Sequence, residues 1–123
     1  YLVNAASCNE CHTKFENGQF TGENLAGGRV FTMPGGNILT SSNLTPHSTG
    51  LGSWSKEQFV ERFKQYKDRS KLRKVQEGEP QTIMPWNMYA DITTEDLEAI
   101  YSYLQTLKPV DNLVVRFTKA KSL

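Results

Sequence analysis

The sequence predicts a small, mainly helical (all-α) domain with about three main helices joined by long loops. Residues 55–66 and 93–108 place apolar side chains at the three- and four-residue spacing of an amphipathic helix. Between residues 16 and 53, glycine and proline recur so often that no long helix or strand fits. A chain of 123 residues is long enough for one hydrophobic core and too short for two. We therefore expect a single domain over residues 1–123.

The N-terminal residues 1–13 are predicted to form a short helix whose apolar stripe contains Leu2, Val3 and Ala6. Residues 16–53 follow as loop, with a small hairpin where residues 29–32 and 37–40 flank a turn. Loops of this length are uncommon in a compact domain unless they wrap around something. The apolar share of 37% is modest, which also fits a core that is partly filled by a group other than protein.

The central helix is predicted to begin after Ser55, because Gln58 follows three residues later and completes a capping box. A basic stretch, residues 64–74, overlaps the end of this helix and holds Asp68 as its one acidic residue. The apolar face of the helix consists of Phe59, Val60, Phe63 and Tyr66.

The last helix, residues 93–108, is the clearest in the sequence. Thr93 is the expected N-cap, and Glu95 and Asp96 place negative charge in the first turn, where the helix dipole is positive. Pro109 ends the helix, and residues 110–123 form a tail. The apolar face consists of Leu97, Ile100, Tyr101, Leu104 and Leu107.

Charge and hydropathy exclude some classes of function. The net charge is +1, so no overall field favours nucleic acid, and we expect no nucleic-acid partner. The longest apolar run, Leu113-Val114-Val115, falls far short of the ~18 residues of a membrane span, so we expect no transmembrane segment in this chain. The sequence begins at Tyr1 rather than Met, which leaves open a targeting segment or membrane anchor ahead of it.

The two cysteines and one of the two histidines stand together as Cys8-Asn9-Glu10-Cys11-His12. This C-x-x-C-H pattern is the attachment signature of c-type haem. Each thiol forms a thioether with one vinyl group of the porphyrin, and positions i, i+3 and i+4 lie on one face of a helical turn. The pattern therefore predicts one covalent haem c, tethered by Cys8 and Cys11, with a nitrogen of His12 bound to iron.

Two other interpretations of the cysteine pair are weaker. A redox dithiol of the thioredoxin kind requires a βαβ context, and nothing in this sequence alternates strands with helices. A zinc site normally requires four ligands, and a second Cys/His pair is missing.

A haem iron bound by one histidine has an open axial position. Closing it with a thioether gives an electron carrier with a raised reduction potential. The candidate ligands are Met33, Met84, Met88 and His47. Met84 precedes Pro85, which favours an extended conformation suited to laying the side chain on the ring. Met33 also precedes a proline, and Met88 lies close in sequence, so local chemistry leaves the choice open, with ordinary packing as the alternative for each methionine.

Further motifs are spread over residues 1–112. They are Tyr1-Leu2-Val3-x-Ala5-Ala6-x-Cys8-x-x-Cys11-His12-Thr13, Leu25-Ala26-Gly27-Gly28, Pro34-Gly35, Asn43-Leu44-Thr45-Pro46-x-x-Thr49-Gly50-x-Gly52-x-Trp54-Ser55, Met84-Pro85-Trp86-x-x-Tyr89 and Asp96-Leu97-x-Ala99-Ile100-x-x-Tyr103-Leu104. On these motifs the chain resembles the class I (monohaem) cytochromes c. Within that group it is similar to the cytochrome c domains of membrane-bound alcohol and gluconate dehydrogenases.

The resemblance implies a class I fold wrapped around one haem, and it implies roles for two more residues. The methionine of the family's Met-Pro segment is the sixth iron ligand, which corresponds to Met84 in the segment 83–89. The family's tryptophan ahead of the central helix hydrogen-bonds a haem propionate, which corresponds to Trp54. The indole N–H is a donor only, which suits a carboxylate; a packed core aromatic is the alternative interpretation.

The sequence departs from the family pattern in three places. The family's Gly-Pro-x-Leu stretch, whose Pro carbonyl accepts the second N–H of the haem-ligating histidine, is Gly22-Glu23-Asn24-Leu25 here. The acceptor is therefore expected to be the Glu23 carbonyl or a group elsewhere. His47 replaces an acidic residue and is expected in an exposed loop, with bis-histidine ligation as the other option. The basic stretch 64–74 either steers an acidic partner or is a solvated charged face.

The function that follows from the motif and the resemblance is one-electron transfer to and from other redox proteins, without catalysis by this chain alone. Because haem is attached covalently outside the cytoplasm, the resemblance implies a periplasmic or otherwise extracytoplasmic location. Two alternatives remain. The chain is a subunit or detached domain of a larger dehydrogenase or oxidase, or it is a haem sensor or peroxidase with an open sixth site.

Overall fold

The computed structural model describes residues 1–121, without the side chain of Lys71; the last two residues of the predicted tail and domain lie outside the described residues. The chain begins with two short helices, α1 (Leu2–Ala5) and α2 (Cys8–His12), where the sequence predicts one. Ser7 separates them because its φ of 58° lies in the left-handed region, which a continuous α-helix does not contain. The C-x-x-C-H motif therefore occupies a helical turn of its own.

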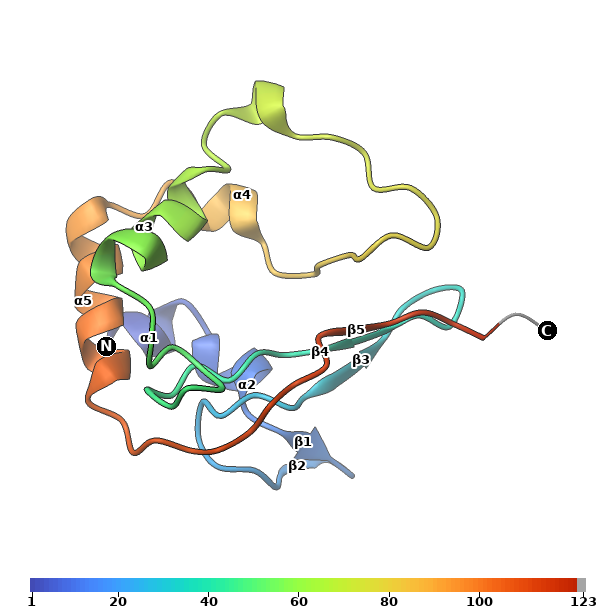
Figure 1. Cartoon of the computed structure of the whole chain (residues 1–123), viewed down its shortest axis with the longest axis horizontal. Coiled ribbons are helices and arrows are strands. Elements are labelled where there is room, and N and C mark those ends of the chain that lie inside the picture. Colours follow the sequence, from blue (N-terminus) through green and yellow to red (C-terminus); the bar gives the residue numbers. More distant parts are fainter. Residues whose placement is uncertain (122–123) are drawn as a thin grey trace.

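Two small antiparallel sheets follow (Figure 1). Strands β1 (Phe15–Glu16) and β2 (Gln19–Phe20) form a tight hairpin. The hairpin predicted around residues 29–40 is present as β3 (Val30–Thr32) and β4 (Ile38–Thr40), with Phe31 opposite Leu39. A third strand, β5 (Phe117–Thr118), returns from the tail and pairs with β4.

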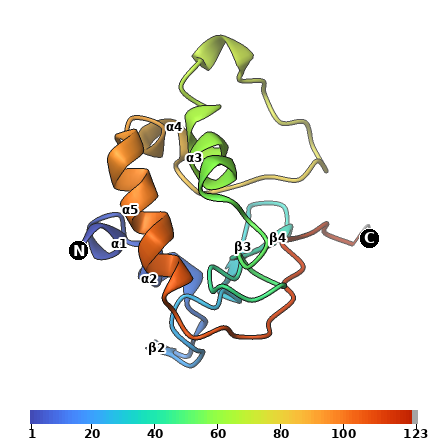
Figure 2. The same ribbon diagram turned by 60° about the vertical axis from the view of Figure 1, so that its left-hand side comes forward.

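The longer helices pack against each other on the other side of the molecule. Helix α3 (Lys56–Lys64) contacts α5 (Thr94–Gln105), and the short helix α4 (Trp86–Tyr89) contacts α3. Figure 2 shows α3 and α5 side by side with α4 at one end, while the sheets lie below them. The predicted capping box is formed, since the Ser55 hydroxyl accepts from the Gln58 amide and the Gln58 side chain accepts from the Ser55 amide. Thr93 caps α5 as expected, and this helix ends earlier than the predicted residue 108.

The hydrophobic core lies mainly between α3 and α5. Leu25 and Leu97 are fully buried, and Leu104 is 1% exposed. Each buried aliphatic side chain of this size stabilises the folded state by about 1.5–3 kcal/mol relative to leaving it exposed. The buried core residues are Val3, Leu25, Leu51, Phe59, Phe63, Leu97, Ile100 and Leu104.

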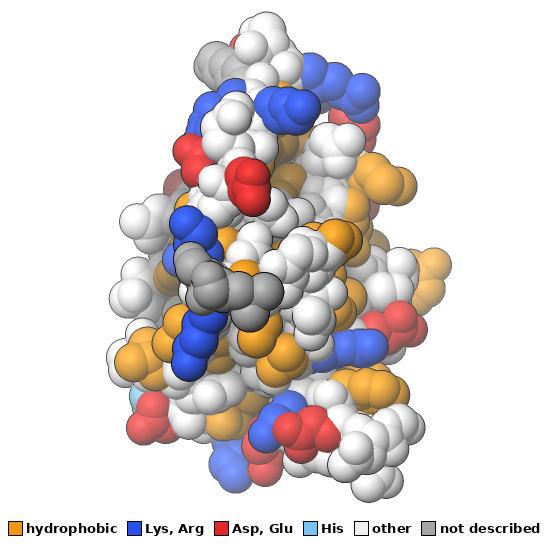
Figure 3. All heavy atoms as spheres, turned by 90° about the vertical axis from the view of Figure 1, so that its right-hand side faces the viewer, with side chains coloured by type: hydrophobic (Ala, Val, Ile, Leu, Met, Phe, Trp, Pro, Cys, Tyr) orange, Lys and Arg blue, Asp and Glu red, His pale blue; other side chains and the backbone are white. Residues whose placement is uncertain are grey.

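The segment between α3 and α4 extends away from this core (Figure 1). It contains a short 3-10 helix, η1 (Arg69–Lys71), and an ion pair in which Arg73 and Glu79 lie 2.8 Å apart. Figure 3 shows Lys and Arg side chains gathered at this end of the molecule. The basic stretch is not a uniform set of free cations, since Arg73 has this partner and the Lys64 ammonium donates to the carbonyl of Ala90, 3.0 Å away.

The tail is held to the loop side by a buried polar network. The Asn43 amide nitrogen donates to the Val110 carbonyl at 2.8 Å, and its oxygen accepts from the Thr45 hydroxyl at 2.7 Å. Asn112 donates to the Ala26 carbonyl at 2.8 Å. Because buried polar groups are costly when unpaired, this network fixes the tail across residues 26–49.

Candidate haem site

Helix α2 presents the two thiols and the imidazole of the C-x-x-C-H motif. Cys8 is half-buried, Cys11 is exposed, and both are free thiols. Burial raises the pKa of Cys8, with a smaller contribution from the nearby Cys11. Since i, i+3 and i+4 share one face of the turn, the three side chains project from the same side of α2.

His12 has one ring nitrogen engaged and the other available. Its Nδ1 lies 2.8 Å from the carbonyl oxygen of Ser42. Because a carbonyl oxygen only accepts, Nδ1 carries the proton, and Nε2 is left with the lone pair that a metal requires. Burial lowers the pKa of His12, opposed by the hydrogen bond to Ser42, so the neutral imidazole is favoured. The acceptor is therefore not the Glu23 carbonyl, which instead accepts from the Ala26 amide at 3.1 Å.

Backbone contacts around Gly27 bring Ser42 to the histidine. The Gly27 amide donates to the His12 carbonyl at 2.7 Å, and the Gly28 amide donates to the Ser41 carbonyl at 2.9 Å. Thr13 forms a parallel bridge with Gly27. These contacts place the chain after α2 directly beside residues 41–42.

The structure separates the three methionines. Met84 is partly buried and packs against the hydrophobic core. Met88 is 69% exposed on α4, so it does not share the environment of Met84. Met33 lies in the β3–β4 turn, where its amide donates to the Asn37 carbonyl. Among the methionines, Met84 is therefore the one that packs against the core.

His47 is not in the exposed position that the sequence predicts. Its side chain is 29% exposed. Its Nδ1 accepts from the Thr49 amide at 3.1 Å and lies 2.8 Å from the Thr49 hydroxyl. These contacts use one ring nitrogen of His47 to shape its own loop.

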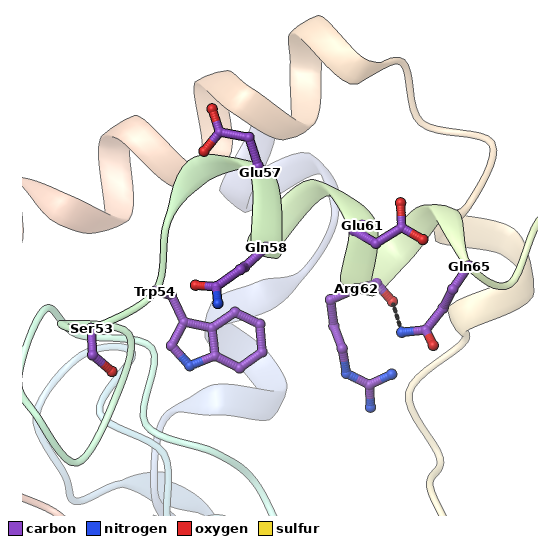
Figure 4. Close-up of a pocket in the computed structure, with 7 residues that line it drawn as sticks. All are labelled: Ser53, Trp54, Glu57, Gln58, Glu61, Arg62 and Gln65. Carbon is purple, nitrogen blue, oxygen red and sulfur yellow. Dashed lines mark hydrogen bonds between the residues drawn. The ribbon is translucent and has the colours of Figure 1, made fainter.

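Trp54 lines a cavity of about 570 Å³ beside α3, within the ~300–1,000 Å³ of small-molecule and cofactor sites. Figure 4 shows its indole and the guanidinium of Arg62 projecting from the same side of α3. No described residue accepts a hydrogen bond from the indole nitrogen of Trp54, so that donor is available to a carboxylate. The cavity lining does not include the C-x-x-C-H side chains or Met84. It is lined by Ser53, Trp54, Glu57, Gln58, Glu61, Arg62 and Gln65.

A second indole, that of Trp86, follows the Met84-Pro85 segment. Its nitrogen is buried and has no hydrogen-bond partner among the described residues. Its ring lies 5.2 Å from that of Phe63 and 5.2 Å from that of Tyr66, measured between centroids. A buried donor without an acceptor is costly, which points to a polar group that the protein alone does not supply.

The sequence model of the Cytochrome c family matches residues 2–108. The chain belongs to the cytochrome c family. Relatives include the fructose dehydrogenase cytochrome subunit of Gluconobacter japonicus, which is 39% identical over 90% of this chain and 21% of its own length. The gluconate 2-dehydrogenase cytochrome c subunit of Pantoea cypripedii is 31% identical over 84% of this chain and 21% of its own length. The chain thus spans about a fifth of the length of these relatives.

As a cytochrome c, the chain carries a covalently attached haem c and transfers electrons rather than catalysing a reaction itself. The residues present fit this group: two free thiols, an imidazole with Nε2 available, and indole donors without acceptors. No cluster of three His, Cys, Asp or Glu side chains able to hold a metal occurs among the described residues. None of the helices within residues 1–121 has the length and hydropathy to span a membrane.

Sequence reasoning missed three groups near the candidate site. The Ser42 carbonyl is a backbone atom, so no residue type marks it. Trp86 and Arg62 carry a weak signal: an indole directly after Met-Pro, and an arginine one turn before Tyr66 on the predicted central helix.

Proposed function

We propose that this cytochrome c domain holds its haem through thioethers to Cys8 and Cys11, with His12 and Met84 as the axial ligands. The observation that carries the ligand assignment is the contrast among the methionines: Met84 packs against the core, whereas Met88 is 69% exposed. Trp54 is the proposed donor to a haem propionate, since its indole projects into the cavity beside α3 (Figure 4).

The haem supplies one-electron chemistry at iron when bound, and the chain sets the conditions for it. His12, oriented by the Ser42 carbonyl, presents Nε2 in a fixed direction. A methionine thioether raises the reduction potential and closes the position at which small ligands would bind. The core side chains around Met84 exclude water and so favour the less charged state of iron.

The chain is proposed to serve as one electron-carrying domain, residues 1–123, within or beside a larger dehydrogenase. Support comes from relatives named as cytochrome subunits of fructose and gluconate dehydrogenases, of which the chain matches 21% of the length. Its partners in this proposal are redox proteins met in small, transient interfaces. The proposed location is periplasmic or otherwise extracytoplasmic, because covalent haem attachment takes place there.

Replacing Met84 tests the ligand assignment. In Met84→Ala, we expect loss of the weak red absorption band of methionine-ligated ferric iron, a lower reduction potential and rapid carbon monoxide binding without denaturant. The matched control is Met88→Ala, which removes an exposed methionine four residues away and is expected to keep the band and the potential.

Two results would contradict the proposal. Retention of the red band in Met84→Ala would assign the ligand to another residue. A high-spin spectrum without the band in the unmodified domain would favour an open sixth position, as in a haem sensor or peroxidase.

A further inference from the structure

Arg62 is held against the aromatic side chains that follow the Met84-Pro85 segment. Its guanidinium carbon lies 4.2 Å from the ring centroid of Trp86 and 5.4 Å from that of Tyr66. One guanidinium nitrogen donates to the Tyr66 hydroxyl. The two rings are stacked, with centroids 5.2 Å apart and planes 24° apart. Cation–π contacts with two rings and a hydrogen bond fix the orientation of this charge.

Ring contacts connect this cation to the C-x-x-C-H motif. Trp86 contacts Phe63 at 5.2 Å, and Phe63 contacts Tyr89 at 6.3 Å, measured between centroids. The Tyr89 hydroxyl donates to the carbonyl of Ala6 at 2.5 Å, just ahead of α2. Burial raises the pKa of Tyr89, with smaller contributions from the thiols of Cys8 and Cys11. Ring contacts therefore link the Arg62 cluster to the segment ahead of α2, and Arg62 itself lines the cavity that contains Trp54.

Among the described residues, Arg62 has no ion-pair partner. Glu57 and Glu61 line the same cavity, but Figure 4 shows their carboxylates directed away from the Arg62 guanidinium. Both glutamates are exposed, whereas Arg62 is half-buried. Solvent and salt screen exposed charges more strongly than partly buried ones, so the two glutamates offset the field of Arg62 only in part.

A cation fixed beside a haem opposes the gain of positive charge when ferrous iron becomes ferric. The interaction follows Coulomb's law in a medium of lower effective dielectric than water, so it persists over several ångströms. We propose that Arg62 acts as a fixed positive charge of the haem pocket and raises the reduction potential of this domain. The inference rests on the proposed attachment of haem through Cys8, Cys11 and His12, and it adds a charge to the ligand effect assigned to Met84.

Potentiometric titration of the haem-loaded domain and its Arg62 variants tests this role. Arg62→Met keeps an apolar stem against Trp86 and removes the charge, whereas Arg62→Lys keeps the charge and loses the planar guanidinium. At a fixed applied potential we expect Arg62→Met to lower the ferrous-to-ferric ratio three- to tenfold, which is a fall of about 28 to 59 mV for one electron. Arg62→Lys is expected to retain most of the unmodified potential.

The control is Lys67→Met, which removes one positive charge from an exposed position five residues further along the chain. We expect this variant to change the ferrous-to-ferric ratio less than twofold. An equal shift in Lys67→Met and Arg62→Met would reduce the effect to net charge and overturn the proposal.

Two further outcomes also overturn it. Equal falls in Arg62→Met and Arg62→Lys would mean that the guanidinium acts through packing rather than charge. Loss of the red methionine band in Arg62→Met would mean that Arg62 holds the Met84 segment in place. Failure of the Met84 proposal is distinguishable from failure of this one. The red band of the unmodified domain reports on ligation by Met84, whereas the difference in reduction potential between the variants can be measured whichever residue is the ligand.

Discussion

At the scale of single residues, the orientation of His12 depends on Gly27, fifteen residues further along the chain. Gly27 has a φ of +75°, and a Cβ placed on it would lie 2.5 Å from the Ser42 carbonyl carbon and 2.6 Å from the Ser41 oxygen. No real side chain tolerates such distances to backbone atoms. The Ser42 carbonyl accepts from His12 Nδ1, so the absence of a side chain at Gly27 allows the contact that orients the imidazole.

We expect Gly27→Ala to destabilise the haem-loaded domain by about 2–3 kcal/mol, because backbone strain adds to the displacement of residues 41–42. The matched control is Gly35→Ala. Gly35 has a similar φ of +87°, but a Cβ at this position would have nothing within 4 Å, so only strain of about 1 kcal/mol is expected. Chemical denaturation of both variants measures the difference. Equal losses would show that the close approach to Ser42 contributes nothing.

At the scale of secondary-structure elements, the sequence was informative wherever side chains mark the ends of an element. Ser55 with Gln58, and Thr93, marked the starts of α3 and α5 correctly, because caps are local side-chain contacts. The break at Ser7 was missed, since a serine in the left-handed region has no sequence signal. The pairing of β5 with β4 was also missed, because it joins residues 38–39 to 117–118 and depends on the path of the tail.

The same reasoning applies to the candidate site. The roles of Cys8, Cys11 and His12 could be proposed from the sequence because the chemistry of haem attachment fixes their spacing in the chain, and they stay predictions. Local chemistry did not distinguish Met84 from Met33 and Met88, and the assignment of Met84 stays a prediction; in the folded protein Met84 packs against the core, whereas Met88 is 69% exposed. The Ser42 carbonyl was not predictable, since a backbone acceptor is defined by the fold alone.

The segment between α3 and α4 contains a surface ion pair between Arg73 and Glu79. The guanidinium of Arg73 binds both carboxylate oxygens of Glu79, and one of these also accepts from the Gln76 amide at 2.7 Å. The hydrogen bond from Arg73 is the main reason that the pKa of Glu79 is lowered. Because the folded pKa lies below the unfolded one, this stabilisation is present above the ordinary pKa of glutamate. It is lost as the pH falls through the lowered value.

At neutral pH we expect Glu79→Ala to lower the hydrogen-exchange protection factor of the Gln76 amide several-fold, leaving the amides of α5 unchanged. Glu77→Ala is the control, since it removes an exposed carboxylate two residues away in the same segment. In the unmodified domain, acidification should lower the same protection factor after correction for intrinsic exchange. A protection factor at Gln76 that is independent of Glu79 would contradict this account.

At the scale of the whole molecule, the buried core is distributed unevenly. Most of its residues lie on α3 and α5, whereas the half that carries the C-x-x-C-H motif contributes Val3, Leu25 and Leu51. That half consists of the short helices α1 and α2, strands of two or three residues, and loops, and such short elements are at best marginally stable in isolation. We therefore expect the haem to strengthen the contacts between the two halves, in the way that a metal or disulfides stabilise other small domains.

A haem-free chain tests this dependence. In Cys8→Ala/Cys11→Ala, which removes both tethers, we expect partial helical structure from the α3–α5 pair but loss of the fixed aromatic environment of Trp54 and Trp86. A ligand that binds only the folded state stabilises that state by mass action. A covalent tether makes this stabilisation independent of the concentration of free haem. Far-ultraviolet circular dichroism measures the remaining helical structure, and near-ultraviolet circular dichroism measures the loss of the fixed aromatic environment. The control is Cys11→Ala, which retains one tether and should remain folded. Cooperative unfolding of the haem-free chain at the temperature of the loaded domain would show that protein contacts alone hold the halves together.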